Sequence, residues 1–148
     1  MKIERRSRFR SRYAAKGGPV WEGRGLGESF VAEDAGHRLE FRANGRRRFV
    51  LLVDGLERMD ATRADDAWEV RTDGESFELR PQSRWRHSFD VLTAAGEKLG
   101  AVRRSRGSVV CDLPGTMASD AQTFIGLVAL SLWKRSAIIA SAAATPQG

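Results

Sequence analysis

The chain has 148 residues, of which 41% are hydrophobic and 30% charged. This size and composition fit one ordinary globular domain and exclude a disordered chain, a collagen-like fibre and a disulfide scaffold. The single cysteine, Cys111, has no partner for an internal disulfide, which fits a reducing compartment. The sequence contains no P-loop, zinc pattern, nucleophile elbow or catalytic triad signature. No biochemical activity can therefore be assigned from sequence motifs.

Positive charge is concentrated at the N-terminus. Residues 1–16 hold seven basic side chains and one acidic one, a net charge of +6 that equals that of the whole chain. We therefore divide the chain into a basic N-terminal arm, residues 1–16, and a single neutral domain, residues 17–148. A neutral domain lacks the surplus positive charge that non-specific nucleic-acid binding requires, so nucleic acid is a disfavoured partner. No apolar segment of the kind an export signal needs follows the arm, which favours a cytoplasmic protein.

A period of two in hydrophobicity dominates residues 28–113 and predicts strands with one wet face. His37, Leu39 and Phe41, for example, alternate with charged side chains. Residues 84–91 repeat this pattern. The middle of the chain is therefore expected to be β-structure.

The segment 49–53 is apolar on both faces, which is typical of a central strand covered on two sides. Asn-Gly and Asp-Gly pairs at 44–45, 54–55 and 73–74 suit tight hairpin turns. Residues 14–28, rich in glycine, indicate an irregular segment instead. The pattern predicts an antiparallel meander of about eight or nine short strands, or about ten with the arm.

The C-terminal part of the sequence predicts one helix, from about residue 119 to residue 143. Ser119 and Gln122 are spaced as a capping box, in which each side chain bonds to the other residue's backbone amide. From Ala121 to Trp133 there is no charged residue, and apolar side chains point in every direction around the helix. This stretch would span about 20 Å, well short of the roughly 30 Å of a bilayer core. We therefore expect a mainly β fold, an antiparallel barrel or strongly curved sheet wrapped around this helix.

Several segments carry a resemblance to a known family, namely Arg84-Trp85-Arg86, Phe89-Asp90-Val91, Gly96, residues 99–104 and the helix from Phe124 to Trp133. With its strand-rich body and C-terminal hydrophobic helix, the chain resembles the tubby-like superfamily, which includes the phospholipid scramblases, the LURP-one-related proteins and small bacterial relatives. The resemblance implies a closed antiparallel barrel around the helix and a patch that binds phosphoinositide or another anionic phospholipid. The best-known barrel that encloses a helix has about 11 strands. The smaller predicted number implies a barrel that is reduced, open or completed by a second copy.

Arginines supply the candidate anion-binding residues. Those of the arm alternate and would form a row of guanidinium groups if the arm is extended; the alternatives are an edge strand or a solvated terminus. The other arginines cluster on predicted strand faces, where ion pairs with neighbouring carboxylates are the alternative explanation. The candidates are Arg6, Arg8, Arg10, Arg12, Arg46, Arg47, Arg48, Arg84, Arg86, Arg103 and Arg104.

No residue stands out as a catalytic acid, base or nucleophile, and we predict no cofactor and no metal site. His37 and His87 lie on apolar faces of predicted strands. With Cys111, they are expected to be buried core residues rather than metal ligands, because their spacing matches no compact metal motif.

The favoured function is a non-enzymatic cytoplasmic module, peripheral to the inner membrane, that binds anionic phospholipid or a protein partner through its arginines. One alternative is a self-associating homo-oligomer in which a second copy supplies missing strands. A less favoured alternative is an enzyme with a pocket at the barrel mouth. If the arm alone is the binding element, removal of residues 1–13 is expected to leave the fold intact.

Overall fold

The polypeptide forms one closed antiparallel barrel of twelve strands. The computed structural model describes residues 1–7, 11–24, 29–82 and 87–144. Successive strands pair as hairpins, and β1 closes the barrel by pairing with β12 as well as with β2. The strands are β1 (Lys2–Arg5), β2 (Arg12–Ala15), β3 (Val20–Gly23), β4 (Ser29–Asp34), β5 (His37–Ala43), β6 (Arg48–Val53), β7 (Leu56–Ala64), β8 (Ala67–Arg71), β9 (Ser76–Pro81), β10 (Ser88–Thr93), β11 (Lys98–Ser105) and β12 (Ser108–Asp112).

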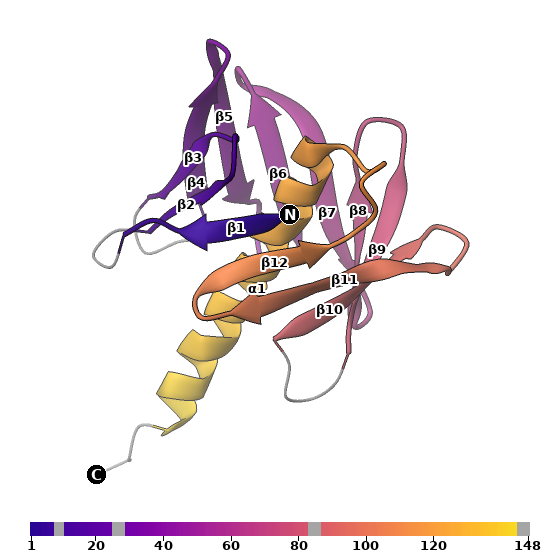
Figure 1. Ribbon diagram of the computed structural model, residues 1–148. Helices are drawn as coiled ribbons and strands as arrows, with labels where there is room; N and C mark the ends of the chain where they lie inside the picture. Colours follow the sequence, from indigo (N-terminus) through magenta and orange to yellow (C-terminus); the bar gives the residue numbers. More distant parts are fainter. Residues whose placement is uncertain (8–10, 25–28, 83–86, 145–148) are drawn as a thin grey trace.

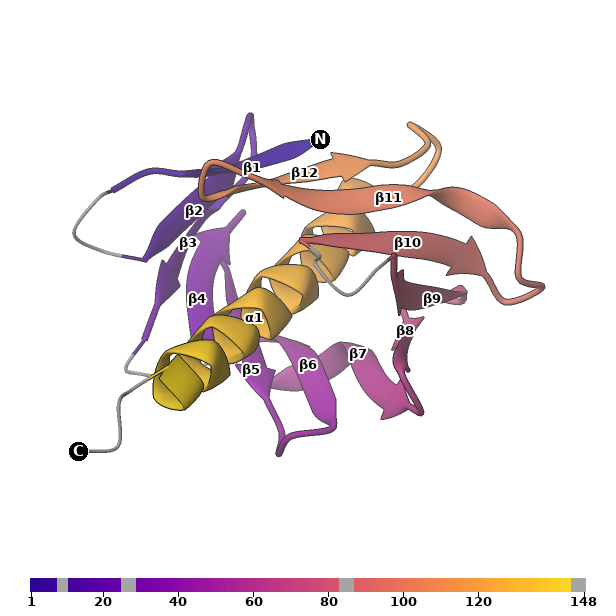
Figure 2. The same cartoon turned by 90° about the horizontal axis from the view of Figure 1, so that it is seen from below.

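A single helix, α1 (Ser119–Ala144), passes through the barrel (Figure 1). The view turned by 90° shows strands on all sides of it (Figure 2). The helix enters at the end that carries the turns β2–β3, β4–β5, β6–β7, β8–β9 and β10–β11, which we name the entry end. Its C-terminal turns project beyond the opposite end, the exit end (Figure 1). The guanidinium group of Arg135 donates to the carbonyl oxygen of Arg46 at 2.7 Å, which places the β5–β6 turn at the exit end.

The helix is buried on every side within the barrel, as its charge-free sequence predicts. The side chains of Phe124, Leu127 and Val128 are at most 1% exposed. Aromatic rings of the barrel wall pack against it in series: the ring centroid of Phe41 lies 5.5 Å from that of Phe49 and 5.7 Å from that of Phe124. A helix that is apolar all round requires a partner on every face, and the closed barrel provides it. The predicted fold class is therefore confirmed.

The nine strands from β4 to β12 agree with the eight or nine predicted for residues 28–113, but the predicted total of about ten is wrong, because the first 24 residues contribute three strands rather than one. β2 and β3 contain six residues of the segment 14–28, for which the sequence predicts irregular structure and of which 25–28 lie outside the described part of the chain. Each has only four residues, too few for a period of two to be visible, and Gly17 makes the turn between them at a φ of 75°. Since twelve strands close the barrel within one chain, no strand from a second copy is needed.

The described parts of the basic segment, residues 1–7 and 11–16, contribute β1 and β2 to the barrel wall. β1 lies between β2 and β12, and the side chain of Ile3 is fully buried in the hydrophobic core. The N-terminal ammonium group of Met1 donates a hydrogen bond to the carbonyl oxygen of Cys111 at 2.9 Å. Removal of residues 1–13 would therefore delete β1 and the first half of β2, so it is not expected to leave the fold intact.

The helix begins at Ser119, as predicted, but the predicted capping box does not form. The amide of Ala121 instead donates to the carboxylate of Asp120 at 2.8 Å. The side chain of Gln122 turns back beyond Ser119, and its amide nitrogen donates to the carbonyl oxygen of Met117 at 3.0 Å. Gln122 thus ties the helix to the loop that precedes it, while Asp120 suits the positive end of the helix dipole.

Cys111 is a core residue, as predicted, with an exposed fraction of 1%. Burial raises the pKa of its thiol to about 11, so the reactive thiolate is scarce at neutral pH. We expect iodoacetamide at about pH 8 to leave the native protein unmodified and to alkylate Cys111 once urea unfolds the chain. Mass spectrometry measures both results, and fast alkylation of the native protein would show that Cys111 is accessible.

Candidate functional site

Positive charge gathers at the exit end of the barrel. Antiparallel hairpins place successive connections at alternate ends, so β1–β2, β3–β4, β5–β6, β7–β8, β9–β10 and β11–β12 all turn at the exit end. The described charged residues of these connections are Arg6, Arg24, Arg46, Arg47, Arg106, Asp65 and Asp66. Those of the turns at the entry end are Lys16, Asp54, Asp73, Glu75 and Glu97. The described turns are thus mainly basic where the helix leaves the barrel and mainly acidic where it enters.

Part of the predicted arginine set lies at this exit end. Arg46 and Arg47 are exposed in the β5–β6 turn. Arg6 is exposed after β1, and its amide donates to the carbonyl oxygen of Arg12 at 2.7 Å. The Arg12 guanidinium lies 3.8 Å from the Glu22 carboxylate, so its charge is partly compensated. The predicted residues outside the described part of the chain are Arg8, Arg10, Arg84 and Arg86.

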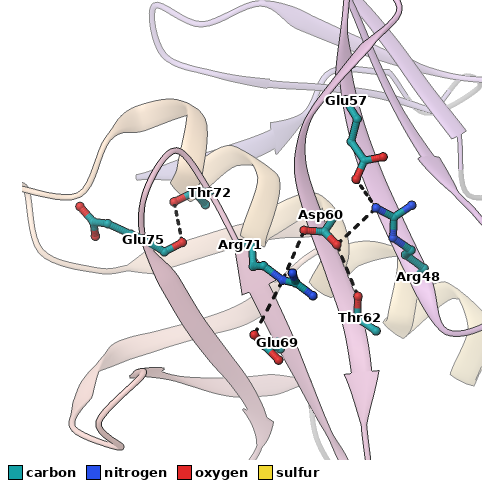
Figure 3. A network of polar contacts seen from close by, with 8 residues as sticks. All are labelled: Arg48, Glu57, Asp60, Thr62, Glu69, Arg71, Thr72 and Glu75. Carbon is teal, nitrogen blue, oxygen red and sulfur yellow. Dashed lines mark hydrogen bonds and ion pairs between the residues drawn. The ribbon is translucent and has the colours of Figure 1, made fainter.

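Arg48 belongs to a network of ion pairs on the outer wall of the barrel (Figure 3). Its guanidinium group contacts the carboxylates of Glu57 and Asp60, and Arg71 approaches Asp60 at 3.8 Å. Val50 lies opposite Asp60 in the β6–β7 ladder, outside the hydrophobic core cluster, and is nevertheless only 2% exposed. This charged network lies along the outer side of β6 and covers that face, while the core covers the inner one. The strand is therefore buried on both faces. The ion-pair explanation for strand-face arginines therefore holds for Arg48.

Arg103 and Arg104 are neighbours in β11, so their side chains point to opposite sides of the barrel wall. Arg104 lies directly opposite Val109, which is fully buried. Because directly opposed residues share one face of a sheet, Arg104 lies on the inner side, near the exit rim. Arg103 lies opposite Val110 on the outer side. Both residues are exposed, and of the two only Arg104 lies on the inner face, at the rim of the exit end.

Three further basic residues, which no sequence pattern singles out, complete the exit end: Arg5, Lys134 and Arg135. The Nζ atom of Lys134 lies 4.9 Å from the ring centroid of Phe30, and Cζ of Arg135 lies 4.6 Å from that of Phe49. Both cations are half-buried over aromatic rings of the inner wall, an arrangement in which the ring faces attract positive charge. The available signal was their position, directly after the last apolar residue of the buried helix.

The surroundings of Lys134 disfavour its positive charge. Burial lowers the pKa of Lys134, and the nearby charges of Arg5 and Arg104 lower it further. Burial also raises the pKa of Tyr13, a shift that the same two arginines oppose. Both groups therefore report positive potential in a partly dry site, which an anion would relieve.

A second candidate site is a cavity of about 480 Å³ at the entry end. Apolar lining comes from Trp21, Leu51 and Phe124, and Arg58 contributes charge. The guanidinium group of Arg58 already bonds to the carboxylate of Asp73 at 2.7 Å. Lys16, Asp34, His37 and Asp120 also line this cavity. Its size suits a small ligand, and its wall carries titratable groups besides the paired Arg58.

The two histidines are exposed, which corrects the prediction that they are core residues. Nδ1 of His37, at the edge of the entry-end cavity, lies 2.6 Å from the carboxylate of Asp54. This hydrogen bond, together with one from the amide of Arg38, lowers the pKa of Asp54. His87 is exposed at the opposite end, before β10. Across the described ranges, no group of three or more His, Cys, Asp and Glu residues is placed to hold a metal ion.

A comparison of the chain with models of known protein families found no match, and neither did comparisons with curated proteins and with solved structures. In the part of the chain that the structure describes, no helix is both long and apolar enough to cross a bilayer. The functional argument therefore depends on the arrangement of charge and burial in the molecule itself.

Proposed function

We propose that this chain is a tubby-like module that attaches to anionic phospholipid surfaces through the exit end of its barrel. A closed antiparallel barrel around a hydrophobic C-terminal helix supports the kinship, since it is the architecture that the resemblance implies. The observation that carries the proposal is the concentration of cationic side chains at one end of the barrel axis. In this proposal the protein is cytoplasmic and peripheral to the inner membrane.

The placement of these cations suits a flat anionic surface. Arg6, Arg24, Arg46, Arg47 and Arg106 lie on connections at one end of the barrel, so one surface can meet them together. Each basic residue held close to an anionic membrane contributes about 1 kcal/mol. The acidic turns of the entry end are repelled by the same surface, which orients the barrel as it approaches.

The alternatives have less support. The case for a homo-oligomer relied on missing strands, and the barrel closes without them. A protein partner with an acidic surface would engage the same charges as a membrane would. Vesicles of pure lipid separate these two possibilities, because they contain no protein.

The test is sedimentation of the protein with vesicles. Wild-type protein should bind vesicles that contain phosphatidylglycerol and ignore pure phosphatidylcholine, and about 0.5 M salt should release it because screening is then strong. The double variant Arg46→Gln/Arg47→Gln removes two exposed charges of the exit end. At about 1 kcal/mol each, the loss should weaken binding by about 30-fold.

Lys16→Gln/Arg38→Gln is the matched control, because it removes the same charge from exposed positions at the entry end. It should bind within about threefold of wild type, since charges on the far side of the barrel are screened over a Debye length of about 10 Å. Equal weakening by both double variants would show that only net charge matters. Absence of wild-type binding at low salt would reject the proposed function.

A further inference from the structure

Three cations converge on the inner rim of the exit end, beside the point where the helix leaves the barrel. They are Arg5 at the end of β1, Arg104 near the end of β11 and Lys134 on α1. The strands β2, β1, β12 and β11 are consecutive neighbours in the barrel. The two arginines therefore come from strands separated only by β12.

The register places both arginine side chains on the inner side. Ile3 and Arg104 both lie opposite Val109, on its two flanks, and Ile3 and Val109 are fully buried. Arg5 follows Ile3 by two residues, so it shares the inner face, and it lies opposite Tyr13 of β2. Each arginine thus continues an inward-facing row past the last buried residue, at the position where the barrel opens.

Lys134 reaches the same rim from the helix. Its Nζ atom lies 5.4 Å from the ring centroid of Tyr13 and 4.9 Å from that of Phe30. Within the described ranges, no carboxylate lies within 4.0 Å of Lys134 or Arg104, although most other strand arginines have such a partner. Burial and two like charges act on this amine together, and both disfavour its charged form. A fold keeps such an arrangement at a cost to its stability, which favours a functional explanation.

We propose that Arg5, Arg104 and Lys134 form a binding site for the phosphate group of a phosphomonoester. The site deepens the proposed function on which it rests, because it names the headgroup chemistry that the exit end would select. A phosphomonoester carries a charge of about −1.5 to −2 at neutral pH and presents three acceptor oxygens, which match three converging cations. A carboxylate or a phosphodiester carries a single negative charge and neutralises them less completely. Guanidinium and ammonium groups both bind phosphate, the former in a bidentate manner and the latter as a point charge.

Two sources can supply this chemistry, a lipid headgroup and a soluble phosphate compound, and the experiment has an arm for each. The lipid arm compares vesicles of phosphatidic acid, a monoester, with vesicles of phosphatidylglycerol, a diester, at matched surface potential. The soluble arm measures binding of glycerol 3-phosphate by calorimetry, with dimethyl phosphate as the diester control. Wild-type protein should prefer the monoester by about tenfold in at least one arm.

Lys134→Met is the principal variant, because methionine keeps an unbranched apolar chain over the rings of Tyr13 and Phe30 while it removes the charge. It should lose the preference for the monoester, while its binding to phosphatidylglycerol falls only by the about fivefold that the loss of one cation of about 1 kcal/mol causes. Lys16→Met, at the entry end, is the matched control and should keep the preference. Near-UV circular dichroism verifies each fold, and Arg104→Gln replaces Lys134→Met if that variant does not fold.

The outcomes separate this inference from the proposed function. Preference for phosphatidic acid that disappears in Lys134→Met supports a lipid headgroup, and preference for glycerol 3-phosphate alone supports a soluble ligand. Binding to both lipids without preference, together with no binding of glycerol 3-phosphate, overturns the phosphate site while the proposed function stands. Binding of glycerol 3-phosphate by a protein that ignores every vesicle supports the site and rejects the proposed function. A preference that Lys134→Met retains also overturns the assignment to these three residues.

Discussion

Val128→Asp is expected to leave the chain unfolded at neutral pH. The side chain of Val128 is fully buried in the hydrophobic core between helix and barrel. An unpaired carboxylate there costs several kcal/mol, a large part of the roughly 5–15 kcal/mol by which a domain is stable. Val128 is a sharper choice than Leu127, because Leu127 also lines the entry-end cavity, where water would hydrate a carboxylate. Urea unfolding followed by tryptophan fluorescence measures the loss.

Ser136→Asp is the control for this substitution, because it adds the same charge to an exposed position of the same helix. Its stability should stay within about 0.5 kcal/mol of wild type. The deficit of Val128→Asp should shrink toward about pH 4, because burial raises the pKa of the new carboxyl and protonation makes it neutral in both states. A Val128→Asp protein with the wild-type urea midpoint at neutral pH would contradict the burial of this helix by the barrel.

The central architecture was predictable because one element dictates it. A helix without a charged residue from Ala121 to Trp133 is too short for a bilayer and has no face for water, so only surrounding protein accommodates it. The hairpin at Asp54-Gly55 was equally legible, since both residues adopt positive φ values, of 51° and 83°, whereas at 44–45 and 73–74 only the glycine has a positive φ. Both signals are local: the first is the lack of a polar helix face toward water, and the second is a residue pair that tolerates positive φ.

The closure of the barrel was not predictable for the opposite reason. β1 pairs with β12, so Ile3 lies opposite Val109, across nearly the whole sequence. No local periodicity announces such a contact, since the four residues of β1 include three charged ones and only Ile3 is buried. The same composition suggested a solvated arm, because charge density is visible in a sequence and a single buried isoleucine is easily overlooked.

The candidate site was predicted only in part, because sequence patterns group neighbours in the chain rather than in space. Arg46 and Arg47 were found together because they are adjacent, yet Arg48, the next residue, turns to carboxylates on the outer wall. Arg104 and Lys134 come from different elements, and they lie close together only because the helix passes through the barrel. Their association depends on register and on the depth of the helix in the barrel, and neither quantity is encoded within one segment.

Deletion of residues 1–5 should destabilise the barrel severely and promote self-association. The truncation removes β1, and with it the pairs that join β1 to both β2 and β12. It also removes the buried side chain of Ile3, worth about 2–5 kcal/mol by comparison with isoleucine-to-alanine substitutions in other cores. Two open sheet edges then remain, and exposed edges pair with other chains. Urea unfolding measures the first effect and sedimentation velocity the second.

Lys2→Ala/Glu4→Ala is the appropriate control, because it alters β1 without removing it. These two side chains are 53% and 48% exposed and form an ion pair at 3.6 Å, a surface interaction worth about 0–1 kcal/mol. The double variant should therefore remain a folded monomer. The truncation removes the backbone of β1 and the side chain of Ile3, which the control keeps. A truncated monomer as stable as this control would therefore show that the barrel does not need β1. The basic N-terminus would then be an arm after all, and the inward orientation assigned to Arg5 would fail with it.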